Sequence, residues 1–214
     1  VPTTVNQLWV ADLTYVRLAE AFVYLAVVLD AHSRRTVGWA PRGLLAASTA
    51  RIGSSPLAMM AEHLRAELAL AALEMALASR EVIPGGLVHH SDRGVQYCSK
   101  DYVRAVLAAG FRVSMGRVGA PQDNSVAERV NGILKCELLL EQTFASFALA
   151  YTATRETIQI YNEERPHLSL DMETPACRFQ KMLNRRRTYR SSVTHSRPQR
   201  SRELRNSLAV DGYG

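Results

Sequence analysis

The chain of 214 residues contains little cysteine: Cys98, Cys136 and Cys177 lie far apart, and none belongs to a C-x-x-C pair. This spacing excludes a disulfide framework and a zinc finger. No apolar run approaches the roughly eighteen residues that a membrane span needs, because charged residues interrupt every candidate. The first residues have neither the charged region nor the apolar region of a secretory signal. These absences predict a soluble, cytoplasmic protein without a membrane partner.

Lysine is also scarce, with 3 Lys against 23 Arg. Codon usage in a GC-rich genome explains this bias more simply than selection for phosphate-binding guanidinium groups, although both explanations remain open. Hydrophobic residues make up 47% of the chain and charged residues 21%, so the composition excludes wholesale disorder. The length corresponds to one domain, or to one domain with a tail.

The positive charge is confined to the end of the chain. Residues 1–177 hold 16 basic and 18 acidic side chains, whereas residues 178–214 hold 10 basic and 2 acidic ones. Beyond Met182 the sequence is rich in Arg, Ser and Thr and lacks periodic apolar positions, so we expect residues 181–214 to form a disordered basic tail. Such a tail either binds phosphates without sequence preference or is read-through from a decayed gene.

The pattern of apolar residues predicts an α/β fold. Five short segments rich in β-branched, aromatic or other apolar residues predict strands, of which the first two form an antiparallel hairpin: 8–18, 22–30, 36–40, 87–90 and 111–114. Capping residues and apolar periodicity predict four helices: 55–80, 99–109, 125–140 and 147–161. This order favours a mixed five-stranded sheet flanked by helices on both faces.

Three carboxylates occupy informative places. Asp12 lies in the middle of a predicted strand, Asp92 directly follows another, and Glu128 lies in the first turn of a predicted helix. An ionised carboxylate in a strand that faces the core is costly unless a partner or a cation neutralises it. Converging carboxylates bind hard cations, and two magnesium ions so held catalyse phosphoryl transfer.

Each carboxylate also has a structural interpretation. Asp12 could pair with a buried arginine, and Asp92 could cap the turn before Gly94. Ser125 and Glu128 fit the S-x-x-E capping box. Lys135 lies on the same face of its helix as Glu128, where it suits a phosphate backbone but equally suits a solvated polar face.

Four motifs resemble, in the same order, those of bacterial insertion-sequence transposases whose catalytic core is like that of retroviral integrases. They are NQLWVADLTY around Asp12, HSDRGVQY around Asp92, DNSVAER around Glu128, and YNEERPHLSL followed by Thr174-Pro175. The 35 residues between Asp92 and Glu128 match the spacing of the Asp-Asp-Glu group. The resemblance covers about residues 5–180, which we expect to form the catalytic core.

The resemblance implies a ribonuclease-H-like fold in which Asp12, Asp92 and Glu128 bind two Mg²⁺ (or Mn²⁺) ions. It implies nicking of DNA and attack of a 3′-hydroxyl on a phosphodiester, as in DNA transposition, integration and recombination. Lys135 matches a position that contacts DNA, and Gln96 and Asn124 match positions near the metals. The implied partners are double-stranded DNA at the element ends and the target, further copies of the chain, and a helix-turn-helix supplied by an upstream domain or a separate protein. The implied place of action is the bacterial nucleoid.

Two departures from the family pattern lead to a second functional hypothesis. Asp12 and Asp92 lie 80 positions apart, and residues 41–60 account for the surplus as a predicted surface insertion. The helix-turn-helix region that precedes such cores is not in this sequence, which is either a catalytic-core segment or part of a longer gene product. The alternative is therefore a catalytically inactive remnant or a DNA-binding module. A nuclease acting on RNA–DNA hybrids is a third hypothesis, which the transposase-like motifs disfavour.

Overall fold

The computed structural model describes residues 2–46, 56–78, 86–117 and 124–195. Contacts divide the chain into two units, Val1–Phe179 and Gln180–Gly214, which are considered separately. No helix in the described ranges is long and apolar enough to cross a membrane.

A mixed sheet forms the centre of the first unit. Its main path has the order β3-β2-β1-β4-β5, and the strands are β1 (Leu8–Leu18), β2 (Ala21–Asp30), β3 (Thr36–Ala46), β4 (Val88–Ser91) and β5 (Arg112–Met115). The first three strands are antiparallel neighbours, whereas β4 runs parallel to both β1 and β5. The predicted five-stranded mixed sheet is confirmed. A two-residue strand that the sequence did not predict, β6 (Thr143–Phe144), pairs with the end of β1.

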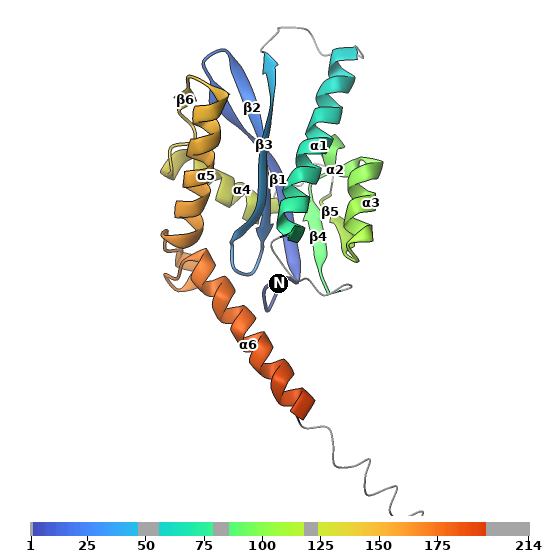
Figure 1. Cartoon of the computed structure of the whole chain (residues 1–214), viewed down its shortest axis with the longest axis vertical. Helices are drawn as coiled ribbons and strands as arrows, with labels where there is room; N and C mark the ends of the chain where they lie inside the picture. Colours follow the sequence, from blue (N-terminus) through green and yellow to red (C-terminus); the bar gives the residue numbers. More distant parts are fainter. Residues whose placement is uncertain (1, 47–55, 79–85, 118–123, 196–214) are drawn as a thin grey trace, which may run out of the picture. The chain divides into compact units, whose positions relative to one another are not determined.

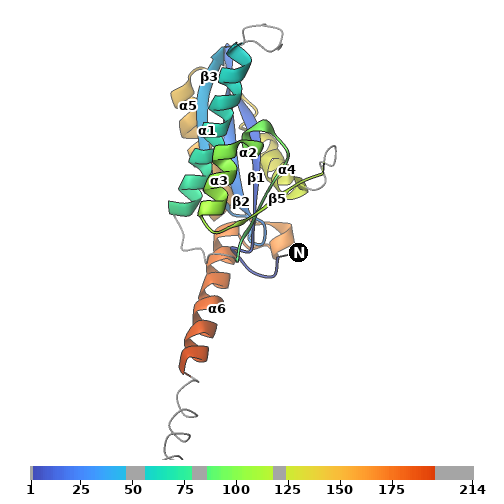
Figure 2. The ribbon, with the colours of Figure 1, turned by 90° about the vertical axis from the view of Figure 1, so that its right-hand side faces the viewer.

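Helices cover both faces of this sheet (Figures 1 and 2). One face packs against α1 (Pro56–Ala78), α2 (Val95–Cys98) and α3 (Lys100–Ala108), and the other against α4 (Ser125–Gly132) and α5 (Phe147–Glu163). Side chains alternate along β1, so that Trp9 and Ala11 enter the first core and Val10 and Val16 the second. Asp12 shares the face of Val10 and therefore points toward the α4 side.

Local sequence signals set most helix boundaries. Ser99 caps α3, with its Oγ accepting a hydrogen bond from the Tyr102 amide, and Ser146 caps α5 in the same way. Gly110 follows α3 with φ 76°, which a residue without a side chain adopts freely. The predicted helix 125–140 differs, because α4 passes at Ile133 into a π-helical turn, η2 (Ile133–Glu137).

Residues 41–60, expected to be a surface insertion, lie largely in regular structure. Residues 41–46 extend β3 and pair with β2 as far as Ala46, opposite Ala21. Residues 56–60 form the first part of α1. Residues 47–55 lie outside the described part of the chain. The described residues of this range thus belong to β3 and α1, and the insertion stays a prediction.

The tail also differs from expectation. Helix α6 runs from Pro175 to His195, although the sequence predicts disorder from residue 181. Arg, Lys, Gln, Met and Leu have high helix propensity, and no Gly or Pro interrupts the segment after Pro175. Gln180 and Asn184 also bond to each other one turn apart. Helix propensity thus explains why residues 181–195 are helical although they lack apolar periodicity. Residues 196–214 lie outside the described part.

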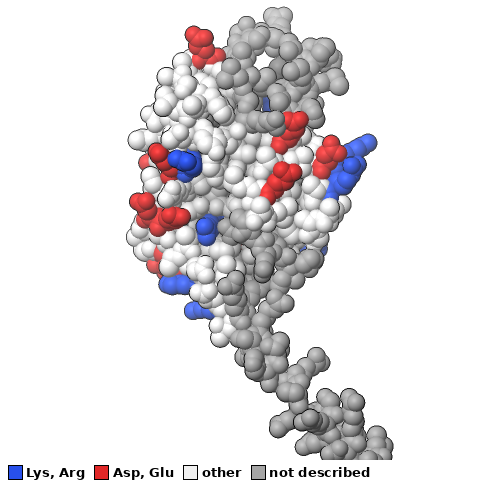
Figure 3. All heavy atoms as spheres, viewed as in Figure 1, with Lys and Arg blue, Asp and Glu red and all other residues white. Residues whose placement is uncertain are grey.

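Charged side chains on the face seen in Figure 1 occur in small mixed groups. Figure 3 shows acidic and basic atoms scattered over the described part of this face, without one broad basic patch. The charge of this face alone therefore does not mark a nucleic-acid interface.

Candidate active site

Two of the predicted acids lie at the same level of neighbouring strands, Asp12 within β1 and Asp92 just after β4. β1 and β4 are parallel, and Ala11 pairs with Ser91. Asp12 follows Ala11, and Asp92 follows Ser91 directly after β4. Ligand sites of open α/β sheets lie at carboxyl ends of strands such as this one. The parallel pairing therefore places Asp12 and Asp92 side by side on neighbouring strands.

Asp12 is half-buried and hydrogen-bonded through both carboxylate oxygens. Its Oδ1 accepts from the Leu13 amide at 2.9 Å, and its Oδ2 accepts from Nδ2 of Asn131 at 2.8 Å. Burial is the main cause that raises the pKa of Asp12 to about 6, and the negative charges of Asp92 and Glu128 also raise it. The two hydrogen bonds act in the opposite direction and lower the pKa. All three predicted acids are thus close enough to interact electrostatically.

Glu128 lies exposed in the first turn of α4. The capping-box alternative is not realised, because the N-cap is Asn124 and no side chain caps the helix. Asn124 is buried, and its Nδ2 donates instead to the carbonyl oxygen of Ala11 at 3.3 Å. This bond fixes the start of α4 to β1, one residue before Asp12.

The acids do not form a closed ligand set. Within the described ranges, no three His, Cys, Asp or Glu side chains are grouped closely enough to hold a metal ion. Asp12, Asp92 and Glu128 therefore share an electrostatic environment, and metal binding by them stays a prediction.

The loop after β4 is tightly packed around Asp92. Its Oδ1 accepts from the Gly94 amide at 2.9 Å, so the structural role predicted as an alternative is present. The side chain of Gln96 is buried against Gly94, where a Cβ would overlap the Gln96 amide and crowd Asp92 Oδ1. A Cβ at position 94 would therefore displace the Gln96 amide, and Gln96 lies beside the second acid.

Tyr97 is a buried neighbour of the acids that the sequence analysis did not identify. Its hydroxyl has no hydrogen-bond partner among the described residues. Burial raises the pKa of Tyr97 well above its usual value, with the charges of Tyr102, Asp12 and Asp92 contributing. Nearby His90 bonds through Nδ1 to Oγ of Ser114 on β5 at 2.9 Å, in keeping with the packing role expected for it.

Lys135 lies in the π-helical turn η2 and not on a regular continuation of α4. Its Nζ lies 3.9 Å from the centroid of the Tyr15 ring. An ammonium above an aromatic face is attracted by the negative charge of the ring face. Lys135 therefore lies beside β1, but its predicted contact with DNA is not tested by this geometry.

The motif at residues 161–167 joins distant segments, which gives its polar residues structural roles. The Tyr161 hydroxyl donates to the Arg34 carbonyl at 3.0 Å. Asn162 accepts from the Thr36 amide at 2.9 Å and donates to the Thr36 carbonyl at 3.1 Å. These bonds fasten α5 to the turn between β2 and β3.

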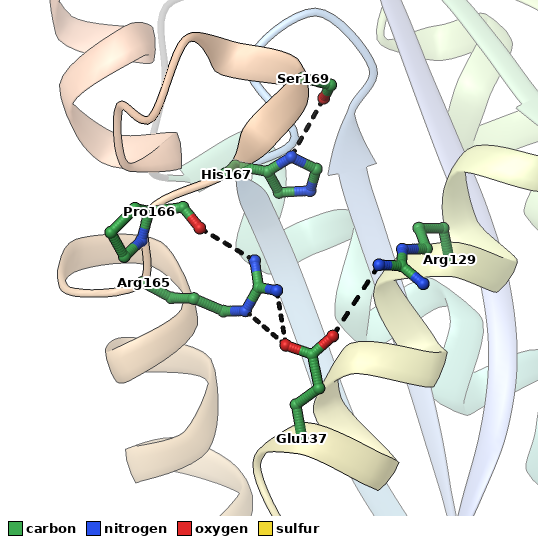
Figure 4. A network of polar contacts seen from close by, with 6 residues as sticks. All are labelled: Arg129, Glu137, Arg165, Pro166, His167 and Ser169. Carbon is green, nitrogen blue, oxygen red and sulfur yellow. Dashed lines mark hydrogen bonds and ion pairs between the residues drawn. The ribbon is translucent and has the colours of Figure 1, made fainter.

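Arg165, from the same motif, binds the far end of η2 (Figure 4). Its Nε donates to Oε2 of Glu137 at 2.9 Å, its Nη2 contacts the same oxygen, and its Nη1 donates to the Pro166 carbonyl. Arg129 approaches the other Glu137 oxygen at 3.9 Å. The ion pair ties the turn that carries Lys135 to the end of α5.

His167 completes this network, and its Nδ1 bonds to Oγ of Ser169 at 3.0 Å. Burial lowers the pKa of His167, and the nearby positive charges of Arg165, Arg34 and Arg129 lower it further. Both effects favour the neutral form of the imidazole.

Sequence reasoning missed the contacts that hold the site together. Asn131 lies three positions after Glu128, but its bond to Asp12 spans 119 positions. Arg165 was recognised only as part of a motif, and its partner Glu137 gave no local signal. A polar residue three positions after a candidate catalytic acid was the available signal for Asn131.

The comparisons with known proteins agree with this arrangement. Two family models, each described as an integrase core domain, match residues 2–52 and 109–175. The insertion element IS600 31 kDa protein of Shigella sonnei is 39% identical over 176 residues, covering 82% of this chain and 57% of that protein. The transposase for IS629 of Shigella sonnei is 36% identical over 160 residues, which cover 75% of this chain and 47% of that protein. Transposase InsF for IS3A of Escherichia coli is 34% identical over 163 residues, with coverage of 76% and 50%.

Solved structures support the fold. A chain of a simian T-cell lymphotropic virus intasome superposes with a TM-score of 0.61 at 17% identity, over 83% of this chain and 55% of that one. The HTLV-2 integrase catalytic core, solved with magnesium, superposes with a TM-score of 0.58 at 14% identity, over 84% and 99%. The predicted ribonuclease-H-like architecture is thereby confirmed.

The chain spans about half the length of the curated relatives it matches. The two integrase-core matches contain Asp12 and Glu128, and Asp92 lies between the two matched ranges. The chain therefore belongs to the family of bacterial insertion-sequence transposases with a retroviral-integrase-like catalytic core.

Proposed function

We propose that this chain cleaves DNA strands and joins them to a target in a reaction that depends on a divalent metal. In the joining step a 3′-hydroxyl attacks a phosphodiester, a new phosphodiester forms, and the displaced target strand leaves with its own 3′-hydroxyl. The observation that carries the proposal is the pairing of Ala11 with Ser91, which places Asp12 and Asp92 at the same level of neighbouring strands, while the Asn131–Asp12 bond ties the helix of Glu128 to the first acid.

The chemistry of these residues suits Mg²⁺ or Mn²⁺. Carboxylate oxygens are the preferred ligands of such hard cations. The half-buried Asp12 carboxylate is destabilised by burial and by two neighbouring negative charges, which a cation would offset. We propose that Asp12, Asp92 and Glu128 hold two ions. When bound, the ions supply activation of the attacking oxygen and stabilisation of the leaving one.

The amides around the acids would orient the reacting groups. Asn131 holds Oδ2 of Asp12 and thereby fixes its carboxylate plane relative to α4. Asn124 fixes the start of α4, and Gln96 lies beside Asp92. We propose that Lys135 contacts the phosphate backbone, with Asn124 and Gln96 contributing near the reacting strand. A phosphate contact positions the DNA without reading its sequence.

The proposed partners follow from the two DNA molecules that the reaction joins. We propose that the chain acts on double-stranded DNA at element ends and target sites, in the bacterial cytoplasm at the nucleoid. A homo-oligomer would bring two ends together. An upstream helix-turn-helix domain, or a separate protein carrying one, would recognise the element ends.

Strand nicking and joining on labelled duplex DNA tests the proposal, with Mg²⁺ and Mn²⁺ added separately. The wild-type chain is compared with Glu128→Gln, which keeps the side-chain shape and removes the charge. Glu156→Gln is the matched control, because Glu156 is also an exposed helical glutamate but belongs to α5. Metal-dependent products are expected from the wild type and the control, and none from Glu128→Gln.

A titration with Mn²⁺ in the absence of DNA separates loss of chemistry from loss of metal. Weaker Mn²⁺ binding by Glu128→Gln, Asp92→Asn and Asp12→Asn supports the three assignments. A folded wild-type chain that binds no divalent ion and makes no product, with a helix-turn-helix partner supplied, would favour the inactive remnant.

A further inference from the structure

One edge of β1 is open just beyond Asp12. β4 pairs with residues 8–11 of β1, and β6 pairs with residues 17–18 on the same side. No strand in the described ranges pairs with residues 12–16 on that side, so a notch separates β4 from β6. Asp12 lies at one end of this notch and Arg17 at the other.

Two cations and an aromatic ring line the far end of the notch. A small pocket is lined by Tyr15, Arg17, Lys135, Leu140 and Glu141. The Tyr15 ring is 46% exposed and packs edge-to-face against Phe22, with ring centroids 5.4 Å apart. Tyr15 and Arg17 occupy positions of β1 whose side chains point to the face opposite to that of Asp12, and Lys135 reaches the pocket from η2.

The Tyr15 ring orients the Lys135 ammonium. Nζ lies 3.9 Å from the ring centroid, which is within the range of a cation–π contact. Such a contact contributes about 0.5–1 kcal/mol at an exposed site, enough to bias a flexible side chain toward one position. The N–H donors of the ammonium that point away from the ring can bond to an anion at the same time.

We propose that this pocket binds a phosphodiester group of the DNA strand that passes the acidic site, with Arg17 and Lys135 as its cations and Tyr15 as the residue that positions Lys135. The inference rests on the proposed DNA chemistry at Asp12. Arg17 and Lys135 outnumber the single lining acid, Glu141, so the pocket carries a net positive charge. A phosphate fits two cations better than a base edge, because the phosphate carries a full negative charge and the base edge is uncharged.

The distance along β1 predicts which phosphate is bound. A strand rises about 3.3 Å per residue, so Arg17 lies roughly 17 Å beyond Asp12. Successive nucleotides of one B-form strand are about 3.4 Å apart along the axis. For a DNA strand that runs along β1, the contacted phosphate therefore lies about five nucleotides from the one that reacts.

Binding of a labelled, nicked duplex to the full chain tests the pocket, measured against salt concentration without divalent metal. Arg17→Gln is expected to reduce the slope of log K against log salt by about 0.9, the value for one lost phosphate contact. Tyr15→Leu is expected to weaken binding, whereas Tyr15→Phe keeps the ring and is expected to bind like the wild type.

The matched control is Arg112→Gln. Arg112 is also an exposed arginine on a strand, but it pairs with Val88 at the end of β4 opposite to Asp92. Urea midpoints of all variants show whether each remains folded. An unchanged slope in Arg17→Gln, or equal losses in Arg17→Gln and Arg112→Gln, would overturn the proposal. Equal losses in Tyr15→Phe and Tyr15→Leu would overturn the role of the ring.

Neutral methylphosphonate linkages placed one at a time along the strand give the position. The linkage that contacts the pocket should weaken wild-type binding and have no further effect on Arg17→Gln. An additive effect at every position would overturn the assignment. This experiment involves no cleavage, so it does not depend on the metal chemistry. If only the metal chemistry fails, the variants will still change DNA binding as described, but no metal-dependent product will form.

Discussion

Asn131 and Asp12 are joined by a hydrogen bond of 2.8 Å from Nδ2 to Oδ2, although 119 positions separate them in the sequence. The bond links α4, which carries Glu128, to the strand that carries the first acid. Asn131 is buried, so the bond is protected from competition by water. The third acid is thereby held near the first through a residue that is not itself an acid.

Replacing Asn131 by Ala should weaken Mn²⁺ binding and DNA nicking by about 10–100-fold, the range for residues that orient metal ligands. The physical reason is that Asp12 Oδ2 loses its donor and α4 loses one of its two side-chain links to β1. The comparison is Gln159→Ala, which removes an exposed amide from α5. Wild-type Mn²⁺ affinity in a folded Asn131→Ala variant would contradict the positioning role.

The Arg165–Glu137 ion pair should contribute more to stability than an ordinary surface pair. A double-mutant cycle with Arg165→Gln and Glu137→Gln is expected to give a coupling of about 1–2 kcal/mol, because the arginine is largely buried and bonds through two nitrogens. Arg104 and Asp101, which are 77% and 73% exposed, form the reference pair. Their coupling should be below about 0.5 kcal/mol. Equal couplings in urea unfolding would show that the bidentate contact adds nothing.

His89 should make the protein less stable as the pH falls. Burial lowers the pKa of His89 to about 4 from its usual 6.5, and its Nε2 bonds to the Tyr102 hydroxyl. Below pH 6.5 the unfolded chain therefore binds a proton at His89 that the folded chain does not bind. The contribution of His89 to the free energy of unfolding is full above pH 6.5 and is lost as the pH falls toward 4. The loss amounts to about 3 kcal/mol.

The check for His89 is the free energy of unfolding of the wild type and of His89→Gln across this pH range. The difference near neutral pH measures lost packing and the lost Tyr102 contact, so only its change with pH reports titration. An identical pH slope in both proteins would rule out a buried neutral His89.

Asp12 should have the opposite effect in metal-free protein. Its pKa is raised to about 6 from 3.8, so the folded chain holds a proton that the unfolded chain releases. This contribution to stability is full below pH 3.8 and is lost as the pH rises toward 6. Asp12→Asn should remove this slope. Mg²⁺ should increase wild-type stability at neutral pH but not that of Asp12→Asn, and equal stabilisation of both would contradict a metal-binding Asp12.

Two glycines should respond differently to alanine. A Cβ at Gly38 would overlap the carbonyl oxygen of Ala72 in α1, so Gly38→Ala forces strand and helix apart. Gly38→Ala should therefore destabilise by about 1–3 kcal/mol. A Cβ at Gly132 would meet nothing within 4 Å, and Gly132→Ala should stabilise the helix by up to about 1 kcal/mol. Thermal unfolding of both variants measures the contrast, and similar shifts would show that β3 and α1 separate freely.

Local patterns in the sequence were sufficient for the order and class of the elements. The two-residue alternation around Asp12 correctly assigned its face of β1, because successive strand side chains point to opposite faces. Ser99 and Gly110 marked the ends of α3 through interactions with nearby backbone. Motif spacing brought attention to Asp12, Asp92 and Glu128 before any geometry was known.

Only the tertiary structure determined how these parts meet. The partners of Asn131 and Arg165 are Asp12 and Glu137, and no local pattern specifies such pairs, because they depend on how the helices pack on the sheet. The passage of α4 into η2 places Lys135 over Tyr15, a contact that a regular helix period would not predict. The sequence by itself determined which residues carry charge and on which element each lies. Packing determined which charges lie together, since burial and proximity exist only in the folded chain.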